Sequence, residues 1–188
     1  MELNHQIMNK KKIYTILFMF LVGSTVYSQK CKVFNTGQKS YYFSGNGIIA
    51  ESYKQVVEDS MNFNALLITK NGLTNKAEVT HISVDSLGCM IIESLSDDSV
   101  VFKSKQKVTK DDIKILFEMN SLNGFYESVC ESVSSHETQV LIVSNYQNKK
   151  WVELTCFDGR IESVLKDNEK ELSYLYNIYS LLFKRKLF

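Results

Sequence analysis

The sequence predicts an α+β fold in which an antiparallel sheet of several strands carries two main helices, at about residues 109–120 and 168–186, on one face. Short apolar or alternating segments follow one another through turn-forming residues, which is typical of hairpins. Two amphipathic segments with capping residues interrupt these strands. Because hairpins pair antiparallel, the order strands, helix, strands, helix indicates helices packed against one antiparallel sheet.

The first half of the chain is expected to form four strands in succession. Asn71-Gly72 separates the first two and is a strong tight-turn signal. Residues 86–88 form the next turn, and residues 77–85 alternate with the period of a strand. The expected strands cover residues 64–70, 77–85, 89–94 and 99–105.

The second half is expected to hold the first helix, a three-stranded meander and the last helix. The Thr109 hydroxyl can cap the first helix, with Asp112 three residues on as in a capping box. Asn168 and Glu171 repeat this spacing before an apolar stripe that continues to Phe183. The expected meander comprises strands at residues 138–144, 151–157 and 160–165.

The N-terminal residues have the order of a secretory signal peptide. Three lysines at 10–12 precede an apolar run at 13–22, and residues 23–28 are then small or polar apart from Val26 and Tyr27. This run is too short for a bilayer-spanning helix, which needs roughly 20 residues. We therefore expect a bacterial protein that is exported to the periplasm or medium, without stable membrane insertion after cleavage. A retained membrane anchor is the alternative.

Cleavage would divide the chain into the signal peptide at 1–28, an irregular N-terminal arm at 29–62 with a short helix, and a single α+β domain at 63–188. Removal of the signal peptide leaves 19 basic and 20 acidic side chains. No basic excess remains to favour nucleic acid, so no nucleic-acid partner is expected.

The cysteines are Cys31, Cys89, Cys130 and Cys156, and an even number in an exported chain predicts disulfides. Three connectivities are compatible with two bridges. Pairing Cys31 with Cys89 and Cys130 with Cys156 is slightly favoured, because each bridge then closes within one half of the chain. Whether Cys31 is bridged, free or modified stays open, although Lys30 directly before it argues against lipidation.

Catalytic motifs are scarce, and we expect no catalytic, metal-binding or cofactor-binding residue. His81 lies within a predicted strand, and the sequence has no H-E-x-x-H, G-x-S-x-G or C-x-x-C motif. The pattern favours a non-enzymatic binding module over an enzyme. The alternative is an exported hydrolase or thiol-dependent enzyme that uses His136 with Cys130, or His81.

Residues 66–182 resemble the emfourin-like family of small metalloprotease inhibitors in the order and spacing of their segments. The strand-turn sequence LLITKNGLTN is followed by a strand ending at residues 85–88, a capped helix, Gly124-Phe125-Tyr126, a hairpin and a terminal helix. The resemblance implies a non-enzymatic fold that binds a protease. It points to Asn71, Gly72 and Leu73 as the loop that meets a partner. Trp151, the only tryptophan, is a further candidate partner-binding residue or a packing residue.

Overall fold

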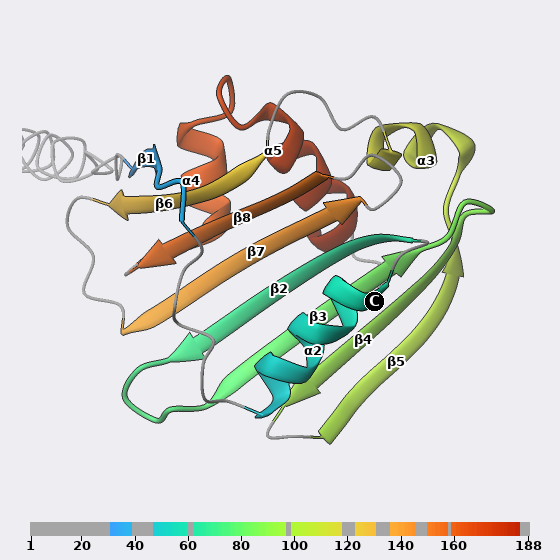
Figure 1. The fold of residues 1–188 in the computed structure, drawn as a ribbon, viewed down its shortest axis with the longest axis horizontal. Coiled ribbons are helices and arrows are strands. Elements are labelled where there is room, and N and C mark those ends of the chain that lie inside the picture. Colours follow the sequence, from blue (N-terminus) through green and yellow to red (C-terminus); the bar gives the residue numbers. More distant parts are fainter. Residues whose placement is uncertain are drawn as a thin grey trace, which may run out of the picture.

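A computed structural model describes residues 31–38, 47–59, 62–96, 99–117, 123–130, 136–145, 150–157 and 159–184. The predicted signal peptide lies outside these ranges. The architecture is a single eight-stranded sheet with helices on both faces (Figure 1). The strands are β1 (Cys31–Asn35), β2 (Phe63–Asn71), β3 (Ala77–Val84), β4 (Cys89–Ser96), β5 (Ser99–Lys107), β6 (Gly124–Cys130), β7 (Glu137–Asn145) and β8 (Lys150–Phe157). The helices are α2 (Gly47–Glu58), α3 (Lys110–Phe117), α4 (Ile161–Asp167) and α5 (Ser173–Tyr179), which continues into a π-helical turn, η2 (Ser180–Lys184).

The sheet has the strand order β1-β6-β8-β7-β2-β3-β4-β5 and is mixed. Strands β2 to β5 form an antiparallel meander, and β7 joins it through β2. The predicted antiparallel pairing holds for all neighbouring pairs of described strands except β6 and β8, which are parallel. Strand β8 lies between β7 and β6. It is antiparallel to β7, its hairpin partner, and runs in the same direction as β6.

Alternation along the strands sends apolar side chains to both faces of the sheet. Ala65, Val143 and Leu154 belong to a core shared with α4 and α5. The intervening residues, such as Leu66 and Ile142, pack with α2 on the opposite face. The two helices predicted to share a face do so, because Leu116 of α3 and Leu175 of α5 belong to the same core. The further helix α2 lies across the opposite face, which is turned to the viewer in Figure 1.

The helix near residue 109 is confirmed, including its cap. The Asp112 backbone N–H donates to Thr109 Oγ1 at 3.1 Å, and α3 extends to Phe117. Residues 118–120 of the predicted helix lie outside the described ranges.

The end of the chain differs from the prediction, because residues 161–167 form the helix α4 where a strand was expected. Ile161, Val164 and Leu165 are buried at the i, i+3, i+4 spacing of a helix. The predicted helix at 168–186 begins only at Ser173, and residues 185–186 are not described. Asn168 caps the end of α4, where its Nδ2 donates to the Val164 carbonyl oxygen at 2.9 Å.

The six strands predicted at 64–70, 77–85, 89–94, 99–105, 138–144 and 151–157 are confirmed, with ends shifted by at most two residues. Strand β6 was not predicted, and β1 forms within the segment expected to be an irregular arm. None of the helices in the described ranges has the length and apolar character needed to cross a membrane.

Candidate functional site

The turn after β2 is built by Asn71 and Gly72. Asn71 Oδ1 accepts the backbone N–H groups of Leu73 and Thr74, each at 3.0 Å, which is an Asx-type turn. The Gly72 N–H donates to the His136 carbonyl oxygen at 2.7 Å, and a Cβ on Gly72 would lie only 3.0 Å from that oxygen. Asn71 and Gly72 therefore shape the loop, and Leu73, 74% exposed, is its outward apolar side chain.

Trp151 lies far from that loop. The ring of Trp151 packs edge-on against Tyr53 of α2, with centroids 5.3 Å apart. Trp151 pairs with Ser144 near one end of β7, whereas Asn71 pairs with Glu137 at the other end. Seven residues of strand separate these positions, which is about 23 Å. The four predicted partner-binding residues therefore do not form one surface, and Trp151 joins the core beneath α2.

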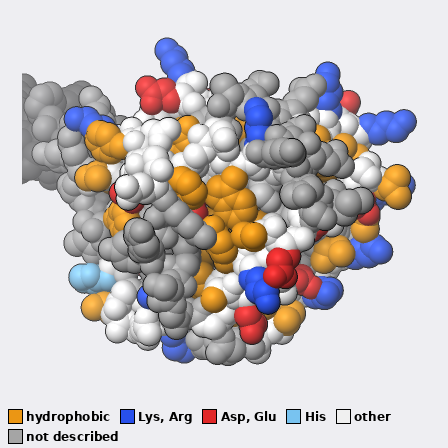
Figure 2. All heavy atoms as spheres, viewed as in Figure 1, with side chains coloured by type: hydrophobic (Ala, Val, Ile, Leu, Met, Phe, Trp, Pro, Cys, Tyr) orange, Lys and Arg blue, Asp and Glu red, His pale blue; other side chains and the backbone are white. Residues whose placement is uncertain are grey.

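The face that carries α2 also holds buried polar side chains on β8. Hydrophobic side chains gather at the centre of this face (Figure 2). Glu153 is 1% exposed and projects to the same face as Trp151, two positions along the strand. Burial, and next the nearby Glu153 carboxylate, raise the pKa of Tyr53 to about 12. The Tyr53 phenol is therefore neutral near pH 7.

The disulfide joins Cys31 and Cys130, which corrects the pairing favoured from the sequence. The β1–β6 register sets the two residues directly opposite each other, with their Cα atoms 4.1 Å apart. Cys89 and Cys156 are free. Because the Cys130 sulfur is bonded to Cys31, it is not available as the thiolate partner of His136.

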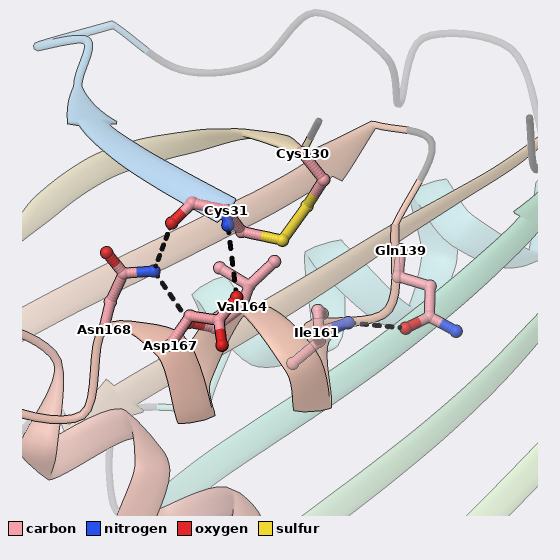
Figure 3. Close-up of a disulfide and its surroundings, with 7 residues drawn as sticks. All are labelled: Cys31, Cys130, Gln139, Ile161, Val164, Asp167 and Asn168. Atoms are coloured by element: carbon pink, nitrogen blue, oxygen red, sulfur yellow. Dashed lines mark hydrogen bonds between the residues drawn. A yellow bond between two sulfur atoms is a disulfide. The ribbon is translucent and has the colours of Figure 1, made fainter. Parts of the chain in front are cut away.

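Hydrogen bonds from α4 hold the same end of β1 (Figure 3). The Cys31 N–H donates to Asp167 Oδ2 at 3.1 Å, and Asn168 Nδ2 donates to the Cys31 carbonyl oxygen at 2.9 Å. The N-terminal strand is thus fixed to the sheet by a covalent bond and to α4 by polar contacts.

The two free thiols differ in accessibility. Cys156 is fully buried, and burial raises the pKa of its thiol to about 12. Cys89 is half-buried at the start of β4.

We expect a maleimide reagent to label about one thiol, Cys89, in the folded protein and two after unfolding without reductant. Mass spectrometry of the labelled peptides reads out the sites. Labelling of Cys31 or Cys130 without reductant, or of no cysteine after unfolding, would contradict the disulfide assignment.

His81 forms a buried polar network rather than an open site. Its Nε2 lies 2.8 Å from Asn64 Oδ1, and Asn64 Nδ2 donates to Asp59 Oδ2 at 3.1 Å. Since the Asn64 amide nitrogen serves Asp59, the oxygen faces His81 and Nε2 carries the proton. Burial lowers the pKa of His81 below 6.5, while the carboxylates of Glu93 and Asp59 oppose this shift. Among the described residues, no cluster of three or more His, Cys, Asp or Glu side chains could hold a metal ion.

The network predicts a pH dependence of stability. In acid, the unfolded chain protonates His81 near its ordinary pKa, while the folded protein resists protonation until a lower pH. The free energy of unfolding should therefore fall as the pH drops below about 6.5, by at most about 1.4 kcal/mol per pH unit from this group. His81→Gln should flatten that part of the curve in urea titrations. Parallel curves for the two proteins would contradict this assignment.

The outer strand β5 is the most exposed part of the sheet. Among the described strands it pairs only with β4, and it lies at the lower right edge in Figure 1. Val100, Val101 and Phe102 are 58%, 68% and 38% exposed. Lys103, Lys105 and Lys107 follow at alternate positions, and Figure 2 shows basic side chains along this edge.

The register determines where these lysines point. Lys105 lies opposite Ile91 and Lys107 opposite Cys89, so both side chains project from the face that carries α2. They help to line a groove of about 470 Å³, together with Asp85, Leu87, Cys89 and Gln106.

The backbone of β5 has an inner and an outer set of polar groups. Val108 directly follows β5, and its N–H donates to the Gly88 carbonyl oxygen at 2.9 Å, so the backbone polar groups of Val108 point toward β4. Because hydrogen-bonded positions alternate along an antiparallel pair of strands, the backbone N–H and C=O groups of Ser104 and Gln106 also point toward β4. Lys103, Lys105 and Lys107 turn their N–H and C=O groups outward, away from the sheet.

This edge could not be assigned from the sequence because its exposure depends on strand order. The strand expected at 99–105 is confirmed, but its local sequence does not indicate that it lies at the edge of the sheet. The alternation of lysines in KSKQK is the signal that could have marked an edge.

The sequence matches no family model, and a comparison with curated proteins gives no match.

Proposed function

We propose that this chain is an exported, non-enzymatic binding module that engages a protein partner by adding the partner's strand to β5. The observation that supports it most directly is the outward row of backbone groups at Lys103, Lys105 and Lys107. Such groups can hydrogen-bond to an extended chain in the manner of β-strand addition. The exposed apolar residues at the start of β5 provide side-chain contacts beside that row.

Export is part of the proposal. It is supported by the composition of residues 1–28 and by the Cys31–Cys130 disulfide, because such bonds persist mainly in oxidising compartments. The resemblance to the emfourin-like family makes a protease the class of partner to examine first.

The test is site-specific photo-crosslinking in the cells that produce the protein. A photoreactive residue at Val101 should give a discrete adduct with one protein, whereas the same residue at Val57, an exposed position on α2, should not. Lys105→Pro removes one outward N–H without breaking the ladder to β4, and proline is tolerated at such edge positions. It should abolish the adduct.

Lys105→Thr is the matched control, because it keeps the outward N–H and a strand-forming residue. A Val101 adduct that persists in the folded Lys105→Pro variant, or that forms equally from Val57, would overturn strand addition at β5.

A further inference from the structure

We propose that the segment recognised by β5 is acidic, with carboxylate side chains at alternate positions that pair with Lys105 and Lys107. This inference rests on the proposed function, since it assumes that a strand is added at this edge. It identifies the partner by its chemistry: an extended polypeptide segment with alternating Asp or Glu residues.

The first argument is that the open backbone groups and the lysine side chains belong to the same residues. A strand bonded to the outward groups of Lys105 and Lys107 places its own residues directly across from them. Residues directly opposite in a sheet project to the same face, with Cβ atoms about 4.5–5.5 Å apart. A carboxylate at such a position can therefore reach the lysine ammonium group.

The second argument is that the ammonium groups of two of the three lysines are available to pair with a carboxylate of the partner. Lys103 forms an ion pair with Glu93 of β4. Within the described ranges, no ion pair engages Lys105 or Lys107. The residues opposite them on β4 are the uncharged Ile91 and Cys89. Asp85, which lines the same groove, accepts the N–H groups of Leu87 and Cys89 at 2.9 and 2.8 Å. Its carboxylate is therefore engaged in the β3–β4 turn.

The third argument is that the charges disfavour a second copy of this chain. Antiparallel pairing of two β5 strands through their outward groups would set lysines of one copy opposite lysines of the other. Like charges directly opposite one another destabilise a sheet, and edge lysines commonly prevent such pairing. An acidic segment reverses the sign of the same interaction.

The test uses the full chain recovered from its producing cells and two synthetic peptides of about eight residues, a typical strand length. One peptide alternates glutamate with valine and threonine, and the other has lysine in place of each glutamate. By fluorescence anisotropy we expect the acidic peptide to bind at least about tenfold more tightly, from two or more favourable cross-strand pairs. Added salt should reduce this preference.

The variant Lys105→Glu/Lys107→Glu should reverse the preference, and Lys105→Thr/Lys107→Thr should remove it. Lys105→Pro should weaken the binding of both peptides, and circular dichroism confirms that each variant is folded.

Equal binding of the two peptides, with the binding of both lost in Lys105→Pro, would overturn the acidic preference while supporting strand addition. Binding that Lys105→Pro leaves unchanged would overturn strand addition itself, as would failure of both peptides to bind. A dimer of the unliganded protein in sedimentation that Lys105→Pro dissolves would identify a second copy as the occupant and overturn the inference.

Discussion

Replacing both bridged cysteines, as Cys31→Ala/Cys130→Ala, is expected to lower the free energy of unfolding by about 4–5 kcal/mol. The bridge spans 99 residues of sequence, and a loop of that length restricts the unfolded chain strongly. The backbone bonds from Cys31 to Asp167 and Asn168 do not depend on the side chain. The loss therefore measures the covalent link rather than those contacts. Guanidinium unfolding followed by circular dichroism measures the difference.

Cys89→Ala serves as the control, because Cys89 is free and half-buried. It should change the free energy of unfolding by less than about 1 kcal/mol. Equal stabilities of the double variant and the parent protein, both measured without reductant, would show that the bridge does not form in solution.

Phe63→Ala is expected to destabilise the protein by about 3–5 kcal/mol. Phe63 is 0% exposed at the start of β2, and its ring centroid lies 6.1 Å from that of Phe117 in α3. Its removal leaves a cavity between the sheet and α3, which the rigid strand cannot close. Thermal unfolding should show a correspondingly lower midpoint.

Leu73→Ala is the matched surface control, since this side chain in the β2–β3 turn is 74% exposed. It should change stability by no more than about 0.5 kcal/mol. Similar losses at Phe63 and Leu73 would contradict the placement of β2 within the core.

Local patterns were sufficient for most strands and for the start of α3. The β2 and β3 segments have the alternation or apolar continuity of strands, and Thr109 has a cap that acts within one turn. These features depend on neighbours in the sequence, so they can be predicted without the fold.

The errors share a different cause, because each depends on contacts between distant residues. The disulfide follows from the β1–β6 register, which no spacing of cysteines reveals. Residues 161–165 are apolar enough for a strand, but Ile161, Val164 and Leu165 meet the sheet as one helical face. Asn168 has the residue type of a helix start, yet it serves the end of α4 and the backbone of Cys31.

The candidate site shows the same division. Asn71, Gly72 and Leu73 were identified as a loop, and they form one, but Trp151 belongs to another end of the sheet. The β5 strand was predicted as a strand, whereas its position at the edge emerged only from the order of all eight strands.

Amide hydrogen exchange by NMR tests the central claim most directly, because it reports each backbone N–H of β5 separately. In the free protein the N–H groups of Lys103, Lys105 and Lys107 should exchange rapidly, and those of Ser104 and Gln106 slowly. The acidic peptide should then protect the three lysine amides. Uniform protection along β5 in the free protein, or lysine amides that stay unprotected when the peptide is bound, would contradict an open edge that accepts a strand.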